Sequence, residues 1–465
     1  MTSREAAWTL PFGYEELDQY VTGSATLPDL LDVLGPYVME HADEVVERLS
    51  SADLRVLYDN VVDGLHEWLD RVGSRGDMPL PEDVWSALLD TGEELAPPTM
   101  AKAMVTGIAE RARPALLAAL GARGTVELVR GSWAPFPASP LRELTDIALA
   151  PRPTVQDRRY SPAFAGGGLL HDPPVELKVV YDFSQRAALG DALSDVAVLA
   201  TVHPSPAEQE YSIDAATDTT FFGYRPTDDV PVLDAARSLL QKAFESGVAV
   251  AVLPELWIGP DVDIQEWLSE SVLTYPRVVV AGSRHVRDEG EQHNECSVYL
   301  DGVPVHTHHK THAFLARTSL PGDGNGWRGT EQDPALPVER VEDLHPSRTV
   351  TVLFADRWAF SVAVCADLNW SAVSHALADH RVNLVCVPAM SPKPGYFHTA
   401  LSDIAQRSRG IGVLANDRRH APAGASVPSA MFALCAERPV VMEHVATAPA
   451  LVLWRLPDVA EEVNA

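Results

Sequence analysis

The chain has 465 residues, of which 46% are hydrophobic and 22% charged, so we expect two or three folded domains rather than a disordered chain. A formal net charge of -29 argues against phosphate backbones and anionic lipid surfaces, and we expect neither a nucleic-acid nor a membrane partner. The chain lacks an apolar run of membrane-spanning length, and its N-terminus lacks a signal-peptide pattern, which predicts a cytoplasmic protein.

Residues 1–150 are predicted to form an all-α domain of unknown role. Apolar residues recur at helical spacing in LPDLLDVLGPYVMEHADEVVERL, LRVLYDNVVDGLHEWLDRV and MAKAMVTGIAERARPALLAALG, with breakers between these runs. The Pro- and Gly-rich segment APRPTVQDRRYSPAFAGGGLLHDPP then predicts a linker. We therefore place a linker or extra strand at residues 151–190 and a second domain at residues 191–465.

The second domain is predicted to be a layered α/β structure. Short apolar runs, many followed by a helical pattern, indicate strands that are buried on both faces. The predicted helices include VLDAARSLLQKAFESG and SAVSHALADH. The predicted strands are VELKVVYDF, VAVLATVHP, VAVAVLPE, RVVVAGS, CSVYLDG, TVTVLFAD, FSVAVCAD, VNLVCVPA, IGVLAND and ALVLWRLP.

Three of these runs lead to a chemically capable residue. Glu255 follows AVAVLP among apolar neighbours, where a carboxylate tends to have a raised pKa and can act as a general base; a solvated turn residue is the alternative. Lys310 follows CSVYLDGVPV in a loop-like segment. Cys365 lies between a strand and a helix start, where amides and a cation can lower a thiol pKa from about 8.5. Side chains at strand ends converge on a common crevice in α/β sheets.

The other cysteines are interpreted as buried and inert, because no CxxC pair indicates a zinc ribbon or a disulfide framework; they are Cys296, Cys386 and Cys435. The stretch VPVHTHHKTHAF places four histidines around Lys310. An H-x-H-H pattern can bind zinc, but no cysteine or carboxylate lies close by in the sequence. A metal site therefore stays the lesser alternative.

Glu255 in VLPELW, Lys310 in HHKTHAF and Cys365 in VAVCADLNW follow one another in the order, approximate spacing and strand-end contexts of a known triad. The sequence resembles the nitrilase superfamily, the carbon-nitrogen hydrolases with a Glu, Lys, Cys triad, from about Ala197 to Pro457. The resemblance implies a four-layer αββα sandwich, a small-molecule substrate, a homodimer, and neither a metal nor a cofactor. AQRSRGIGVLAND, with Arg407 and Asn416, is similar to a later helix and strand of the family.

The resemblance implies that Cys365 attacks a carbonyl or nitrile carbon while Glu255 transfers the proton. Lys310 and a backbone N–H near Ala366 would stabilise the developing negative charge. The family usually carries a second active-site glutamate, for which Glu331 is the best candidate, with Asp323 and Glu339 behind it. The sequence departs from the family at Arg409 and Gly410, where Glu and Asn are common.

CADL lacks the Cys-Trp-Glu signature of true nitrilases, which favours amide or carbamoyl substrates. The substrate-binding candidates lie just beyond predicted strand ends: Trp257, Ala366, Asp367, Asn369, Trp370 and Met390. Asp367 is equally well explained as a helix N-terminal carboxylate. Two alternatives to hydrolysis stay open: an N-acyltransferase or amide synthase that uses the same acyl-enzyme, and a catalytically decayed binding or regulatory module.

Overall fold

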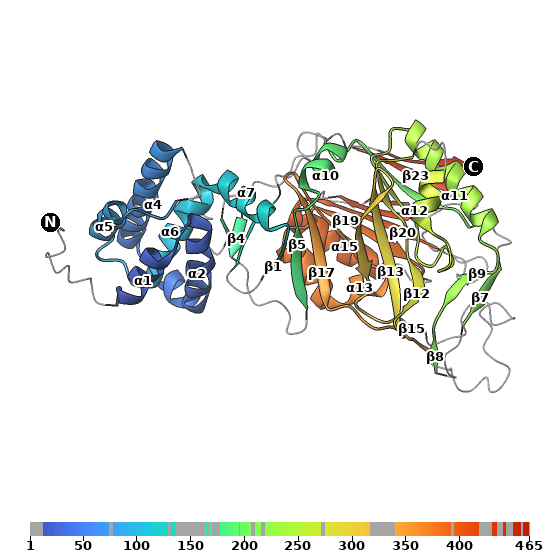
Figure 1. The fold of residues 1–465 in the computed structure, drawn as a ribbon, viewed down its shortest axis with the longest axis horizontal. Helices are drawn as coiled ribbons and strands as arrows, with labels where there is room; N and C mark the ends of the chain where they lie inside the picture. The colour runs from blue at the N-terminus through green and yellow to red at the C-terminus, as the bar shows by residue number, and fades with distance from the viewer. Residues whose placement is uncertain are drawn as a thin grey trace. The chain divides into compact units, whose positions relative to one another are not determined.

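The fold is taken from a computed structural model of the chain (Figure 1). It describes residues 13–73, 78–128, 132–135, 137, 163–164, 167–169, 177–194, 196–205, 210–214, 219–270, 275–316, 340–391, 395–417, 430–434, 440–442, 450–456 and 459–464. The chain divides into two compact units, Met1–Phe136 with Pro151–Ser184, and Pro137–Ala150 with Gln185–Ala465.

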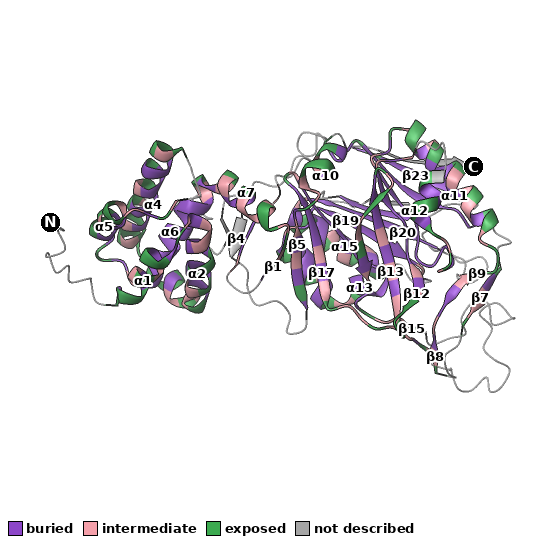
Figure 2. Cartoon of the chain, viewed as in Figure 1, coloured by how far each residue is buried: buried purple, intermediate pink, exposed green. Residues whose placement is uncertain are grey.

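The first unit is built around one fully buried helix. Helix α6 (Pro97–Arg111) packs on α2, α3, α4 and α7, and its residues from Pro98 to Ala109 are buried on every side (Figure 2). Small residues on α6 allow this close packing. The surrounding helices are α1 (Glu15–Gly23), α2 (Leu27–Glu40), α3 (Ala42–Arg48), α4 (Ala52–Val72), α5 (Glu82–Thr91) and α7 (Arg113–Arg123).

The described part of residues 1–150 is therefore largely helical, but it is not all-α. Two short strands, β1 (Thr125–Leu128) and β2 (Trp133–Pro135), follow α7. Strand β1 pairs antiparallel with β5 (Lys178–Asp182), and β2 pairs with β4 (Gly167–Leu169), which also pairs with β3 (Ala163–Phe164). The predicted helical domain thus continues into strands from the segment that the sequence predicts to be a linker.

Two mixed sheets form the second unit. One has the order β12-β13-β11-β10-β6-β23-β24, with β14 beside β13, and the other contains the run β17-β18-β19-β20-β21-β22. Each of the ten predicted apolar runs contains a strand. One of these strands, β5, belongs to the first unit. The strands of the first sheet are β6 (Val198–His203), β10 (Val250–Val252), β11 (Val278–Val280), β12 (Arg284–Asp288), β13 (Glu291–Leu300), β14 (Val303–His309), β23 (Ala450–Arg455) and β24 (Val459–Asn464).

The strands of the second sheet are β17 (Thr349–Ala355), β18 (Trp358–Val362), β19 (Leu384–Ala389), β20 (Ile411–Asn416), β21 (Ala430–Leu434) and β22 (Val440–Met442). Smaller pairings join β7 (Tyr211–Ile213) to β9 (Tyr224–Pro226), and join β16 (Arg340–Glu342) to both β8 (Thr220–Phe221) and β15 (Leu315–Ala316).

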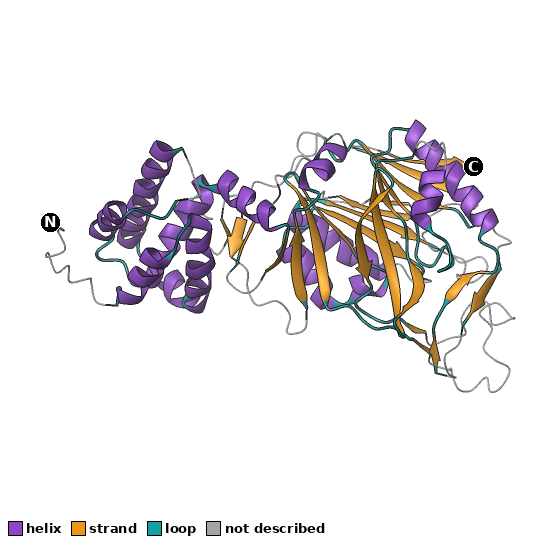
Figure 3. Ribbon diagram, viewed as in Figure 1, coloured by secondary structure: helices purple, strands orange, loops and turns teal. Residues whose placement is uncertain are grey.

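The two sheets face each other, and helices cover their outer faces (Figure 3). Strands β6 and β10 contact β20, and β10 also contacts β19. Helix α11 (Val230–Glu245) packs on β6 and β23, whereas α15 (Gly395–Ser408) packs on β20 and β21. The other described helices of this unit are α10 (Arg186–Ala192), α12 (Ile264–Glu270), α13 (Ala366–Asn369) and α14 (Ser371–Asp379). The predicted helices in VLDAARSLLQKAFESG and SAVSHALADH correspond to α11 and α14.

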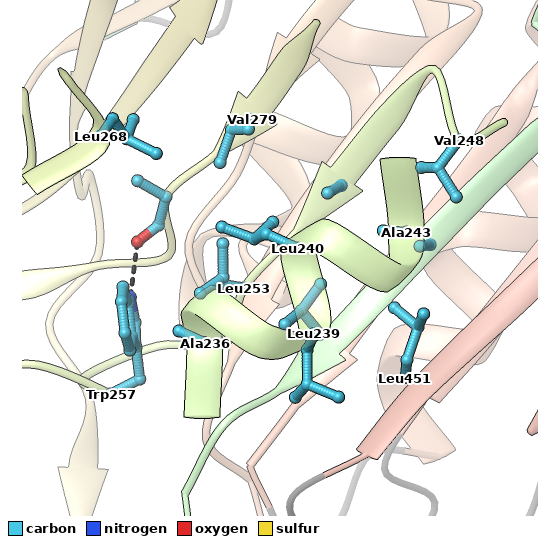
Figure 4. Packing of buried hydrophobic residues seen from close by; sticks show 14 of the residues in the cluster. Ala236, Leu239, Leu240, Ala243, Val248, Leu253, Trp257, Leu268, Val279 and Leu451 are labelled. Atoms are coloured by element: carbon cyan, nitrogen blue, oxygen red, sulfur yellow. Dashed lines mark hydrogen bonds between the residues drawn. The ribbon is translucent and has the colours of Figure 1, made fainter. Parts of the chain in front are cut away.

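The core beneath α11 shows why this sequence forms the layer. The buried face of α11 carries Ala236, Leu239, Leu240 and Ala243, which pack against residues of the sheet such as Leu451 (Figure 4). Burial of each of the larger side chains contributes about 1.5–3 kcal/mol.

Because β6, β10 and β11 run parallel, their carboxyl ends lie at one edge of the sheet.

Candidate functional site

Glu255 lies three residues beyond β10 and is 2% exposed. An isolated parallel bridge joins it to Ser283, and the Leu256 N–H donates to the Ser283 carbonyl at 2.7 Å. This close approach requires a glycine, because a Cβ at Gly282 (φ +68°) would lie 2.1 Å from the Pro254 carbonyl oxygen. The turn therefore fixes Glu255 at the edge of the sheet.

Lys310 directly follows β14 and is 1% exposed. Its Nζ donates to Glu255 Oε1 at 2.8 Å and to Glu342 Oε2 at 2.8 Å. Burial alone would lower the pKa of Lys310, but the Glu255 and Glu342 carboxylates outweigh it and hold that pKa well above its usual value. A buried ammonium thus lies between two buried carboxylates.

Glu342 ends β16 and has protein donors on both oxygens. Its Oε1 accepts from Asn294 Nδ2 at 2.8 Å and lies 2.8 Å from His285 Nε2, and its Oε2 also accepts from the Phe314 N–H at 2.9 Å. His285 Nδ1 accepts the Tyr224 N–H at 3.1 Å, so Nε2 carries the ring proton and donates it to Glu342. Burial would raise the pKa of Glu342, but Lys310 and His285 shift it below its usual range.

Asn294 connects the two carboxylates. Its Nδ2 donates to Glu255 Oε1 at 3.0 Å as well as to Glu342 Oε1. The other oxygen of Glu255, Oε2, accepts the Met390 N–H at 3.0 Å. One amide group and one ammonium therefore hold both carboxylates in fixed positions.

Cys365 lies at a sharp turn between β18 and α13. Its backbone has φ 47° and ψ -105°, close to the first central residue of a type II′ turn, a position usually taken by glycine. The Cys365 N–H donates to the Pro388 carbonyl at 2.9 Å. Burial, and then the Glu255 carboxylate, raise the pKa of the Cys365 thiol well above its usual value, while Lys310 and the Met390 N–H oppose this. The three predicted triad residues thus meet in one place.

Asp367 is fully buried and ties the lysine segment to the cysteine turn. Its Oδ1 accepts from the Thr311 N–H and hydroxyl, each at 2.7 Å, and from the His312 N–H at 2.8 Å. Its Oδ2 accepts from the Val364 N–H at 3.0 Å and lies 2.9 Å from His308 Nε2. Both oxygens are occupied by protein groups, so Asp367 positions the site rather than lining it.

The histidines around Lys310 have separate surroundings. His308 contacts Asp367, His312 stacks on Trp370 with ring centroids 5.8 Å apart, and His309 lies 4.6 Å from the ring of His293. Within the described residues, no group of three or more His, Cys, Asp or Glu side chains is arranged to hold a metal ion. The geometry around Lys310 is explained by the two carboxylates and by Asp367.

The remaining sequence candidates lie in different places. Met390 lines the cavity beside the triad, and Ala366 directly follows Cys365. Asn369 is exposed, and Trp370 is half-buried against His312. Trp257 was predicted as a pocket wall, but it is fully buried in the core beneath α11, where its Nε1 donates to the Ala281 carbonyl (Figure 4).

The candidates for the second glutamate, Glu331, Asp323 and Glu339, lie outside the described residues, as does Cys435. Glu342 stands beside Lys310 instead, and sequence reasoning missed it. In the sequence, Glu342 is marked only as a carboxylate inside the short Val-containing run VERVED. His285 and Asn294 were also missed, because each reaches the site only through strand pairing.

A cavity opens beside Glu255, Lys310 and Glu342. Its volume is about 20 Å³, and five apolar or aromatic side chains also line it: Phe221, Tyr224, Leu256, Phe314 and Met390. Beyond the lining, Asn416 at the end of β20 clamps the backbone of Ser391, accepting its N–H at 2.7 Å and donating to its carbonyl at 3.0 Å. This clamp supports the segment that carries Met390.

The second unit is thus an α/β domain of two facing sheets with buried Glu, Lys and Cys side chains meeting at strand ends. Residues 219–412 match the family described as carbon-nitrogen hydrolase, and this match confirms the resemblance to the nitrilase superfamily. The match covers less than half of the chain and lies entirely within the second unit.

Solved structures similar to the chain include an amidase from Nesterenkonia sp., at 17% identity and a TM-score of 0.36, covering 57% of this chain and 91% of that one. Another is Nit3 from Saccharomyces cerevisiae, a member of branch 10 of the nitrilase superfamily, at 13% identity and a TM-score of 0.38, covering 56% of this chain and 90% of that one. No curated protein sequence gives a significant match. Among the described residues, no helix is both long and apolar enough to cross a membrane.

Proposed function

We propose that the protein hydrolyses a non-peptide C–N bond of an amide or carbamoyl compound through an acyl-enzyme on Cys365. One observation carries this proposal: Lys310 Nζ lies 2.8 Å from each of two buried carboxylates, one of which is next to the Cys365 thiol. Burying three charged groups and a thiol together costs free energy of folding, and such clusters are concentrated at functional sites. The family match over residues 219–412 supports the same chemistry.

The first step requires a base, because burial keeps the Cys365 thiol protonated at neutral pH. Glu255 accepts this proton as the sulfur attacks the carbonyl carbon, forming the S–C bond. Collapse of the tetrahedral intermediate breaks the C–N bond, and Glu255 returns the proton to the departing amine. Water, deprotonated by Glu255, then attacks the thioester and releases the acid and the free thiol.

Lys310 stabilises the negative charge that develops on the substrate oxygen. Its raised pKa keeps the ammonium charged through the reaction. The Ala366 N–H, at the first residue of α13, has no partner within the helix and is the second donor. One such donor contributes about 3 kcal/mol to transition-state stabilisation. Glu342 holds the ammonium from the opposite side and does not need to exchange protons.

The test is release of ammonia from primary amides, carbamoyl compounds and nitriles by the intact chain and by Cys365→Ala. We expect release from amides or carbamoyl compounds that falls at least 10³-fold in Cys365→Ala. Cys386→Ala is the matched control, because Cys386 is buried within β19 and outside the site. Equal release by wild type and Cys365→Ala would contradict the proposal.

The same experiment separates hydrolysis from acyl transfer. With an added amine such as hydroxylamine, an acyl-enzyme yields both acid and the new amide, in proportions set by water and amine attack. Acid formation without an added amine identifies a hydrolase. Product formation only when an amine is present would assign the acyl-enzyme to an N-acyltransferase or amide synthase. Absence of reaction, with Cys365 also unreactive toward an alkylating probe, would favour the binding module.

A further inference from the structure

The side chains around the cavity divide sharply by chemistry. Glu255, Lys310 and Glu342 form its charged end, and every other lining residue within the described chain is apolar or aromatic. The apolar and aromatic walls come from segments far apart in sequence: Phe221 from β8, Tyr224 from β9, Leu256 after β10, Phe314 after β14 and Met390 after β19. Such a lining removes an apolar group from water but offers little to a polar one.

Two wall residues bond through their backbone to the charged end, and a third bonds to His285, the partner of Glu342. The Met390 N–H donates to Glu255 Oε2, the Phe314 N–H donates to Glu342 Oε2, and the Tyr224 N–H donates to His285. The aromatic ring of Tyr224 is also stacked on that of Tyr211, with centroids 5.1 Å apart and planes 7° apart. The walls are therefore held in fixed register with the carboxylates and the lysine, so they define the space that the acyl part of a substrate would occupy.

The charges at the site oppose an anionic ligand. Among the described lining residues the only cation is Lys310, and both carboxylates already bind its ammonium group. The two carboxylates and the one ammonium group together leave one formal negative charge at the charged end of the cavity. A second buried carboxylate would be repelled at short range and would lack a partner of its own.

The volume of the cavity also limits the size of the acyl group that can bind. At about 20 Å³ it has room for one or two water-sized positions. An acyl group of about two or three carbons fills this space, and a longer one requires the walls to move.

We infer that the space beside the triad accepts a short, uncharged, apolar acyl group and rejects an anionic one, so that, resting on the proposed function, the substrates are amides of small neutral acids. Monoamides of dicarboxylic acids are excluded. The walls formed by Phe221, Tyr224, Leu256, Phe314 and Met390 supply the selectivity, and the triad supplies the reaction.

The first experiment measures alkylation of Cys365 by iodoacetamide and by iodoacetate, with the modified peptide identified by mass spectrometry. In both reactions the sulfur displaces iodide and an S–C bond replaces the C–I bond, so no hydrolysis is needed. Each rate is divided by the rate for glutathione. We expect the normalised rate at Cys365 to be at least tenfold higher for iodoacetamide. Equal rates, faster reaction with iodoacetate, or no reaction with either reagent would overturn the inference.

Met390 provides a matched pair of variants. Met390→Lys places a cation in the wall and should shift the normalised ratio at least tenfold toward iodoacetate. Met390→Leu keeps an apolar side chain of similar volume and should leave the ratio within about threefold of wild type. A ratio that changes equally in both variants would show that wall charge does not govern selection.

The second experiment measures kcat/KM for amide hydrolysis. Isovaleramide and malonamate are similar in size, but malonamate carries a carboxylate where isovaleramide carries an isopropyl group. We expect kcat/KM at least 100-fold higher for isovaleramide than for malonamate, and a gain of about fourfold from acetamide to propionamide. Faster hydrolysis of malonamate would overturn the inference. Selective alkylation without any amide hydrolysis would overturn the proposed function while leaving the apolar site established.

Discussion

At the scale of single residues, Asp367 makes a larger structural contribution than its position beside the nucleophile suggests. It accepts hydrogen bonds from both sides of the site, from Thr311 and His312 next to Lys310 and from Val364 next to Cys365. Hydrogen bonds to a charged acceptor contribute about 1.5–3 kcal/mol each. Asp367 therefore sets the distance between the lysine and the nucleophile without contacting the substrate.

Asp367→Asn should lower both stability and turnover. An amide can keep the three donors at Oδ1, but its NH₂ group then faces the Val364 N–H and His308. We expect a loss of about 2–3 kcal/mol in the free energy of unfolding, measured with urea. We also expect kcat for the best amide to fall more than KM rises, because Lys310 loses its alignment. A fall in stability with unchanged kcat would show that Asp367 serves folding alone.

The backbone of Cys365 predicts an unusual stability order. At φ 47° and ψ -105°, a side chain is strained and glycine is not. Cys365→Gly should therefore be more stable than Cys365→Ala by about 1 kcal/mol, although both lack the nucleophile. The check is the urea midpoint of the two variants. An alanine variant as stable as the glycine variant would mean that the turn holds no strain.

The sequence predicted the site residues unevenly, for physical reasons. Glu255, Lys310 and Cys365 each follow a strand, so their positions along the chain already place them at strand ends. Glu342 could not be chosen over Glu331 or Glu339, because the intervening segment sets which carboxylate reaches Lys310. Trp257 was assigned to the pocket from its position beyond a strand, but after Leu256 (φ 55°) its side chain lies in the core.

At the scale of elements, the apolar strands were predictable because burial on both faces leaves long Val-rich runs. Each predicted run contains a strand, and the predicted helices α11 and α14 formed. The pairing of the strands was not predictable. Strands β18, β19 and β20 run parallel to one another, whereas β17 pairs antiparallel with β18 and β21 pairs antiparallel with β20. The short strands β1 and β2 were also missed, because runs of three or four residues carry no clear periodicity.

Strand β6 carries a titratable group that should make the second unit acid-sensitive. Burial lowers the pKa of His203 to about 4, against 6.5 for a free histidine. The unfolded chain therefore binds the extra proton between pH 6.5 and 4, and stability falls as the pH falls through that window. We expect His203 to account for about 1–2 kcal/mol of the loss between pH 7 and pH 5.

His203→Gln tests this assignment, because glutamine keeps a polar partner for Thr201, whose hydroxyl lies 3.0 Å from the ring, but does not titrate. The urea-derived free energy of unfolding should fall less between pH 7 and pH 5 in the variant than in wild type. Identical losses would assign the acid sensitivity to other groups, such as His380, whose pKa burial also lowers to about 4.

At the scale of the whole molecule, the two units carry buried lysines with opposite pKa shifts. Burial lowers the pKa of Lys102 on α6 well below its usual value, whereas carboxylates raise that of Lys310. Lys102 gains a proton when the first unit unfolds, so stability of that unit should rise with pH up to about 10.4. The contribution of Lys310 is complete below that pH and is lost above it as pH rises through its folded pKa.

Hydrogen exchange of α6 peptides, compared with α11 peptides, measures this difference. Between pH 7 and pH 9 the protection free energy of α6 should rise by up to about 1.4 kcal/mol per pH unit, and Lys102→Met should remove most of the rise. Protection of α11 should not respond to Lys102→Met. A slope retained in Lys102→Met would show that Lys102 is not the titrating group.

The Glu255 N–H donates to the Ala389 carbonyl at 3.4 Å, and Glu255 and Cys365 come from opposite sheets. The reactive thiol is therefore assembled only when the two sheets have docked. During refolding, selective reactivity of Cys365 should return no earlier than the slowest docking step, even where tryptophan fluorescence has recovered. The nucleophile thus serves as a built-in reporter of sheet docking.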